Sequence, residues 1–167
     1  MKKRTNNYIS ANHNIADFVI WNKKYELGIT IIDEQHKKLV EMTNRLFQAS
    51  TRGSQMANSV FAEIIKEVTD YVKYHFAAEE AFMLKIGYPE LEEHKKEHRD
   101  FIRYLLHAVK EFEEGHSFVP KNFAIFLKDW TLQHIAMSDR RIAIYFFKLK
   151  KQINQKKMEL DAMSVTN

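Results

Sequence analysis

Histidine and glutamate recur four residues apart at two places in the chain. His75 and Glu79 form one pair, and His94 and His98 form the other. Residues at i and i+4 lie one turn apart on the same face of an α-helix, so each pair would present both side chains to one side. One such pair is weak evidence for a site, because a single buried histidine is often only a hydrogen-bonded core residue. Two pairs within apolar stripes are harder to explain, because an unpartnered buried ionisable group is costly.

Two further histidines, His36 and His134, fall on the apolar stripes of two other predicted helices. Four helices would therefore contribute to one central polar cluster. Imidazole nitrogens with carboxylate oxygens suit iron, manganese, zinc or copper, and bridging carboxylates favour a dinuclear centre. The convergence of four helices is the strong indication of a metal site.

The elements that position these residues are all predicted to be helical. The tetrad 30–33 resembles a capping box that opens the first helix, and 54–58 is predicted to be a loop. Gly87 ends the second helix and Pro89 suits the first turn of the third, which ends near Gly115. Pro120 starts a fourth helix, with an apolar stripe through Met137, that runs on through 144–147. Short connections predict an all-α fold, an up-down-up-down antiparallel four-helix bundle with an N-terminal arm packed on it.

Composition agrees with a helical domain and limits its chemistry. The 167 residues include four Gly and two Pro, few for a β-sandwich or barrel. The absence of Cys excludes disulfides, thiolate nucleophiles, zinc fingers and cysteine-ligated iron–sulfur clusters, so a metal site must use histidine and carboxylate. We predict a polar N-terminal arm over 1–20, one domain over 21–150 and a Lys-rich tail over 151–167.

Charge and targeting signals favour a cytoplasmic protein. Residues 1–4 read MKKR but no apolar segment follows, and no apolar run is long enough to cross a bilayer. The net charge of +4 is concentrated near the C-terminus. We interpret this tail as a solvated helix end that could reach an unknown protein partner, and expect no nucleic acid or membrane partner. We expect a monomer or a weak homo-oligomer.

At this point four sequence blocks resemble one family, the bacterial hemerythrins. The blocks are Trp21…Gly28-Ile29…Ile32-Asp33-Glu34-Gln35-His36, His75-Phe76-Ala77-Ala78-Glu79-Glu80…Met83…Gly87-Tyr88-Pro89, His94-x-x-x-His98-x-x-Phe101, and Trp130-x-x-x-His134-Ile135-x-x-x-Asp139. The resemblance covers roughly residues 21–150. It implies a non-heme di-iron centre, with two oxo- or hydroxo-bridged iron ions, that binds dioxygen reversibly as hydroperoxide.

The resemblance also implies a ligand for each position. One iron would take His94, His98 and His134 as ligands. The other would take His36 and His75. The carboxylates of Glu79 and Asp139 would bridge the two iron ions. The two-histidine iron would keep an open position for dioxygen. Trp130 and Thr131 would line the oxygen pocket, where family members commonly carry Leu at the position of Thr131.

The spacing between His134 and Asp139 requires a physical explanation. Five residues on a regular α-helix turn the two side chains about 140° apart. We therefore predict a π-bulge, or a strongly tilted helix, that turns both inward. His107, nine residues past His98, should point outward, and His13 and His116 should be surface histidines.

Two other functions remain open. The same centre could serve an enzyme or stress protein that removes peroxide or nitric oxide or repairs iron centres, although histidine-rich ligation favours oxygen binding over oxidase chemistry. A regulatory module acting through the arm or the tail is the third possibility. We favour an oxygen carrier, store or sensor that is not an enzyme.

Overall fold

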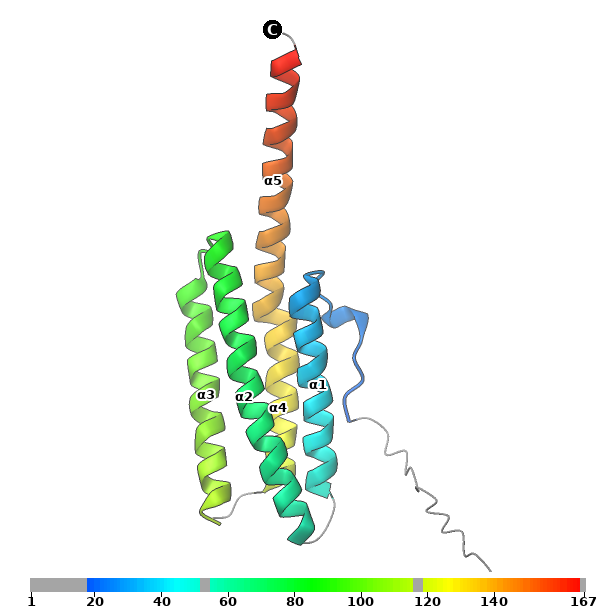
Figure 1. Cartoon of the computed structure of the whole chain (residues 1–167), viewed down its shortest axis with the longest axis vertical. Coiled ribbons are helices and arrows are strands. Elements are labelled where there is room, and N and C mark those ends of the chain that lie inside the picture. Colours follow the sequence, from blue (N-terminus) through cyan, green and yellow to red (C-terminus); the bar gives the residue numbers. More distant parts are fainter. Residues whose placement is uncertain (1–17, 52–54, 116–118, 166–167) are drawn as a thin grey trace, which may run out of the picture.

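The computed structural model describes residues 18–51, 55–115 and 119–165, with the side chains of 55–59 and 165 left out. Four long rods form the bundle (Figure 1). A short helix, η1 Lys23–Tyr25, precedes them, and the rods consist of six segments: α1 Thr30–Thr51, α2 Gln55–Ile86, α3 Leu91–Glu113, α4 Pro120–His134, η2 Ile135–Asp139 and α5 Arg140–Val165. Together α4, η2 and α5 make one continuous rod.

The helices alternate in direction, as predicted. In Figure 1, α1 runs down, α2 up, α3 down and the α4–α5 rod up. The described residues contain helices and no strand. Apolar side chains from all four rods fill the lower half of the bundle, and Leu46, Val68, Leu105 and Ala124 are fully buried. This core supports the half of the bundle that contains the histidines.

The helix ends follow the local signals in the sequence with two corrections. Gly87 has φ 64°, and the amides of Gly87 and Tyr88 donate to the carbonyls of Leu84 and Met83, which closes α2 with a Schellman motif. The predicted loop over 54–58 is wrong from Gln55 on, because α2 begins there. The capping box is also wrong, since Thr30 lies inside α1 and Asp33 accepts from residues further back.

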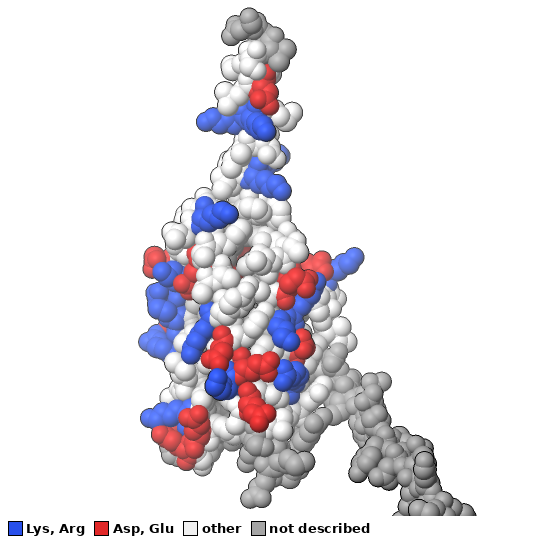
Figure 2. Space-filling view, in the orientation of Figure 1, with Lys and Arg blue, Asp and Glu red and all other residues white. Residues whose placement is uncertain are grey.

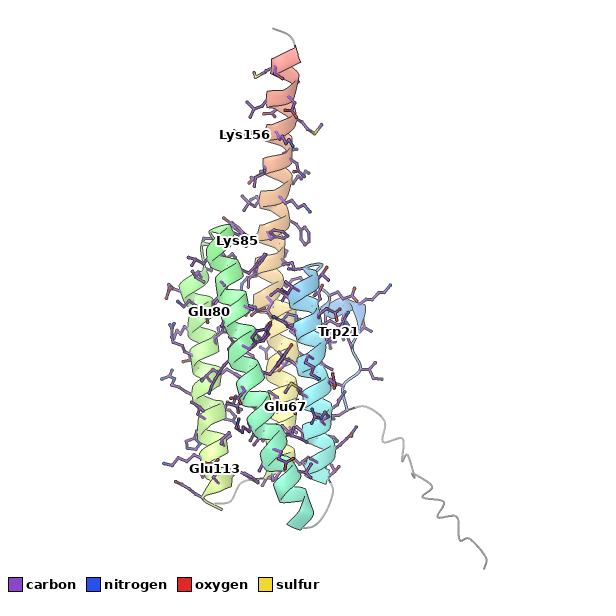
Figure 3. The ribbon with its side chains drawn as sticks, viewed as in Figure 1. Trp21, Glu67, Glu80, Lys85, Glu113 and Lys156 are labelled. Atoms are coloured by element: carbon purple, nitrogen blue, oxygen red, sulfur yellow. The ribbon has the colours of Figure 1, made fainter. Side chains whose placement is uncertain are left out.

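The segment before α1 packs on the bundle. Leu27 and Ile29 are buried against Ile32, Ile135 and Ala143. Trp21 lies beside the N-terminal end of α1 (Figure 3). Of the arm predicted over 1–20, residues 18–20 are described; Val19 is buried there and its amide donates to Oδ1 of Asn44, while residues 1–17 lie outside the described residues. The boundary predicted at residue 150 falls inside α5, which continues without a break to Val165.

Two further observations concern the surface. Among the described residues, we find no helix with the length and apolarity that a membrane span requires. In Figure 2 the projecting end of α5 shows patches of Lys or Arg at separate levels and an acidic patch near its tip.

Candidate metal centre

Five histidines from the four rods bring their Nε2 atoms together in the upper half of the bundle. They are His36 on α1, His75 on α2, His94 and His98 on α3, and His134 on α4. None is more than 6% exposed. The carboxylates of Glu79 and Asp139 lie among them and are equally buried. All seven residues that we predicted as metal ligands therefore lie in one cluster.

Asp139 faces two groups of histidines with its two oxygens. Its Oδ1 lies 3.1 Å from Nε2 of His134 and 3.4 Å from Nε2 of His94. Its Oδ2 lies 3.2 Å from Nε2 of His36. The carboxylate thus reaches both sides of the cluster.

Glu79 spans the cluster in the same way. Its Oε1 lies 3.5 Å from Nε2 of His36, whereas its Oε2 lies 3.3 Å from Nε2 of His98 and 3.6 Å from Nε2 of His94. Nε2 of His75 is 3.7 Å from Oε2. Two sets of side chains could therefore each hold a metal ion, and both include Glu79. The first set adds His36 and His75, and the second adds His94, His98 and His134.

A π-helical turn, η2, brings Asp139 into the cluster. It occupies Ile135–Asp139, directly after His134, and Asp139 is fully buried. The wider turn rotates Asp139 onto the face of His134, as the spacing of five residues requires. The π-bulge prediction is confirmed. The same rotation corrects our placement of Met137 on the inward stripe, because this side chain is 57% exposed.

The outer nitrogens of three histidines are paired with oxygens of neighbouring side chains. Distances of 3.0–3.1 Å join Nδ1 of His75 to Gln35 Oε1, Nδ1 of His98 to Glu80 Oε1, and Nδ1 of His134 to Glu97 Oε2. Because amide and carboxylate oxygens accept, each Nδ1 carries the hydrogen, which leaves the Nε2 lone pair directed at the centre. Ser138 also donates to Glu97 at 2.6 Å, which fixes that carboxylate. Sequence analysis did not identify these three partners.

Apart from Nε2 of His98 and Nε2 of His134, which lie within hydrogen-bonding distance at 3.2 Å, several donor atoms at the centre lie close together without a hydrogen-bond partner. Among the described residues, the buried atoms without a hydrogen-bond partner include Nε2 of His36, Nε2 of His94, Oε2 of Glu79 and both carboxylate oxygens of Asp139. Unsatisfied buried polar atoms are costly and rare in native proteins. Cations between these nitrogen and oxygen atoms would satisfy them. The residues therefore fit a pair of metal ions with nitrogen and oxygen ligands, among them iron.

Opposite charges within the cluster compensate for the cost of burying its ionisable groups. Burial alone would lower the pKa of His36, but the carboxylates of Asp139 and Glu79 outweigh it and raise the pKa to about 9. For His134 the same balance, with Asp139 and Glu97, raises the pKa to about 10. Burial dominates at His75 and lowers its pKa to about 4. In metal-free protein, protons on His36 and His134 would therefore take the place of cations.

Aromatic rings surround the three-histidine side. Phe76 stacks on His98 with ring centroids 3.6 Å apart, and Trp130 stacks on His134 at 4.4 Å. Thr131 is buried on the same helix as His134. The rings restrict these imidazoles to one orientation. That Trp130 and Thr131 line an oxygen pocket remains a prediction.

The segment before α1 covers the carboxylate side of the cluster. Asp33 accepts from the amides of Leu27 at 2.7 Å and Gly28 at 2.9 Å, which ties the segment to α1. Arg140 donates to the carbonyls of Glu26 and Lys24. These bonds hold Leu27 against the bundle, where apolar side chains line one small space together with Glu79 and Asp139, and both carboxylates are buried.

Of the remaining histidines, His107 lies among the described residues and is apart from the cluster. The side chain of His107 is 73% exposed, so the prediction that it points outward is confirmed. His13 and His116 lie outside the described residues.

Comparison with known proteins identifies close similarity over most of the chain. Residues 27–143 match the family described as hemerythrin HHE cation binding domain. A bacteriohemerythrin of Stenotrophomonas maltophilia is 33% identical over 82% of this chain and 85% of its own. One from Pseudomonas aeruginosa is 37% identical over 72% of this chain and 76% of its own. A crystal structure of wild-type hemerythrin superimposes with a TM-score of 0.71 at 28% identity, covering 75% of this chain and 95% of that one.

Proposed function

The chain belongs to the hemerythrin HHE cation-binding domain family, and on that premise we propose that it binds dioxygen reversibly at two iron ions. The proposed metal ligands are His36, His75, Glu79, His94, His98, His134 and Asp139. We propose a role as oxygen carrier, store or sensor rather than as an enzyme.

One observation carries the proposal: each carboxylate directs one oxygen to the three-histidine group and the other to His36, while His75 lies 3.7 Å from Oε2 of Glu79. Asp139 does so with Oδ1 and Oδ2, and Glu79 with Oε2 and Oε1. A carboxylate that spans two groups of nitrogen donors is the arrangement that a dinuclear centre requires. A mononuclear site would leave one group of histidines unused.

The two groups differ in how many side chains they offer. Together with the shared carboxylates, His94, His98 and His134 would supply five protein ligands to one metal ion, whereas His36 and His75 would supply four to the other. The ion with fewer protein ligands would be the one that a small molecule could reach. Two iron ions, held by the two groups of ligands, would supply the two electrons that reversible dioxygen binding uses.

The protein's own groups would keep that chemistry reversible. The oxygens of Gln35, Glu80 and Glu97 hold the imidazoles in the tautomer that directs Nε2 inward. Leu27 and the apolar residues around it exclude water from the carboxylate side. Restricted access of water favours release of dioxygen over irreversible oxidation.

Iron analysis tests the composition of the centre. Protein reconstituted with ferrous iron without oxygen should contain two iron ions per chain and should take up one dioxygen per chain. Metal content measured by mass spectrometry and oxygen uptake measured with an electrode give both values. Binding of a single iron ion per chain at saturation would contradict the proposal.

The hydroxyl of Thr131 leads to a prediction about autoxidation. We expect Thr131→Leu to autoxidise more slowly than the wild type, several-fold in rate, because a leucine side chain removes a polar group near His134 and excludes water. The measurement follows loss of the oxygenated absorption band in air. Thr69→Val is the matched control, since Thr69 is also buried but bonds its own helix at Ile65. Slower autoxidation in the wild type than in Thr131→Leu would refute the prediction.

A further inference from the structure

A groove between α2 and α3 runs along the outer side of the metal centre. It has a volume of about 600 Å³ and lies where Glu80 of α2 pairs with His98 of α3 (Figure 3 labels Glu80). Both residues line the groove, and so does Phe76, whose ring stacks on the imidazole of His98. Small-molecule sites commonly enclose about 300–1,000 Å³, so the groove has the size of one. A molecule held in it would lie against a proposed metal ligand without entering the centre.

The floor of the groove is apolar and suits a flat ring. Phe76 contributes a buried aromatic ring to it, and Ala77 and Ile102 add aliphatic surface. Rings pack favourably against one another in stacked or edge-to-face contact, and the removal of apolar surface from water adds to that gain. The floor therefore favours a planar aromatic molecule over a sugar or a simple ion.

The rim of the groove has an excess of positive charge. Its two carboxylates already have partners, since Glu80 pairs with His98 and Asp100 pairs with Arg103. Three further basic side chains line the groove and form no ion pair within the part of the chain that the structure describes; they are Lys73, Lys96 and Arg99. This uncompensated charge favours an anionic group on the bound molecule.

We propose that the groove binds a reduced flavin phosphate, which returns oxidised iron to the state that binds dioxygen. The inference rests on the proposed function, because an oxygen-binding di-iron protein that has autoxidised needs two electrons. The flavin ring would lie on Phe76, and the phosphate would face Lys96 and Arg99, which lie three residues apart on one face of α3. A dihydroflavin gives up two electrons, one for each ferric ion, and two protons, which pass to water; it leaves as the oxidised flavin.

The position of His98 favours a flavin over other planar anions that carry electrons. A flavin can release its electrons one at a time, so they can pass through the rings of Phe76 and His98, whose centroids are 3.6 Å apart. A reduced nicotinamide releases both electrons as a hydride, which needs direct contact with its acceptor. The imidazole of His98 separates the groove from the metal, so a hydride would not reach it.

Titration of the iron-loaded full chain with flavin mononucleotide tests the site. Quenching of flavin fluorescence should show one site per chain, and riboflavin, which lacks the phosphate, should bind at least about tenfold more weakly. Lys96→Glu should weaken binding of flavin mononucleotide about tenfold or more and leave riboflavin unchanged, because it repels the phosphate. Lys151→Glu is the matched control, since Lys151 is exposed on α5 and lies outside the groove. Equal binding of the two flavins or of the two variants would overturn the proposal, as would a chain that binds neither flavin.

Stopped-flow reduction of the di-ferric protein tests the transfer of electrons. Reduced flavin mononucleotide should bleach the di-ferric absorption at a rate that saturates, and below saturation Lys96→Glu should react about tenfold more slowly than Lys151→Glu. Ala77→Leu, which fills the floor without a change of charge, should slow the reaction as well. Dithionite should reduce Lys96→Glu and Lys151→Glu at equal rates, because their net charge is the same. Equal rates with the flavin would overturn its role as reductant.

Oxygen binding separates this inference from the proposed function. After reduction by dithionite, Lys96→Glu should bind dioxygen like the wild type, since Lys96 lies outside the proposed centre. A chain that binds dioxygen reversibly but not the flavin would overturn the inference alone. A chain that takes electrons from the flavin but does not bind dioxygen reversibly would contradict the proposed function alone.

Discussion

Replacing Asp139 by asparagine should abolish binding of the second iron ion and leave at most one per chain. Asparagine keeps the size and shape of the side chain but removes its charge. Oδ1 and Oδ2 of Asp139 face different histidine groups, so the change weakens both sides of the centre at once. Loss of an outer partner already costs about 10- to 100-fold in metal affinity, and loss of a bridging charge should cost more. Iron content after gel filtration measures the effect.

A nearby aspartate supplies the matched control for this variant. Asp129 lies on α4, is exposed and pairs with Lys128 at the surface. Asp129→Asn should keep two iron ions per chain. Circular dichroism should show that both variants remain helical, which separates loss of a ligand from loss of the fold. Full iron content in Asp139→Asn would mean that Asp139 does not bridge.

Removal of iron should lower the melting temperature by about 10 °C or more. The ions bind only the folded arrangement of donors from four rods, so their binding free energy adds to the stability of the fold. Without them, Glu79 and Asp139 remain buried among imidazoles that only protons can charge. Calorimetry of chelated and reloaded protein measures the difference. An unchanged melting temperature would mean that the iron ions do not bind at this cluster.

Iron removal should also expose a pH dependence of stability. In metal-free protein the pKa of His36 is raised to about 9 and that of His134 to about 10, above the ordinary value of 6.5. The contribution of these two histidines to the free energy of unfolding is therefore complete below pH 6.5 and is lost as the pH rises through 9 to 10. The pKa of His75 is lowered to about 4, so its contribution falls as the pH drops from 6.5 to 4. The free energy of unfolding should be greatest near pH 6.5.

The alkaline side of this profile is the sharper test. A shift of the size seen at His36 corresponds to roughly 3 kcal/mol lost between pH 6.5 and 9. In iron-loaded protein the imidazoles bind metal and cannot take up these protons, so the loss should disappear. Urea unfolding of both forms across this range measures it. Metal-free protein that becomes more stable as the pH rises above 7 would contradict the electrostatics.

The sequence predicted the central features of the fold because each has a local cause. Gly87 and Pro120 mark helix ends through backbone conformation, and apolar periodicity placed His75 and His98 on inward faces. The π-turn followed from one number, the spacing of five residues between His134 and Asp139. The geometry of these features depends on neighbours in the chain, which a sequence displays directly.

Features that depend on contacts between helices could not be predicted in this way. Gln35 lies on α1 but bonds His75 on α2, and Glu97 on α3 pairs with His134 on α4. No spacing along the chain links such pairs. Met137 was misplaced for a related reason, because a π-turn rotates the residues inside it and the helical stripe assumed a regular turn.

The visible spectrum of the iron-loaded protein tests the central claim most directly. Protein reduced without oxygen should be nearly colourless, should gain a charge-transfer band in air and should lose it when oxygen is removed. Repetition of this cycle with full recovery is the result that reversible dioxygen binding predicts. Direct and permanent conversion to an oxidised di-ferric spectrum on the first exposure would contradict it, and would leave an enzymatic or redox-sensing role for the same centre.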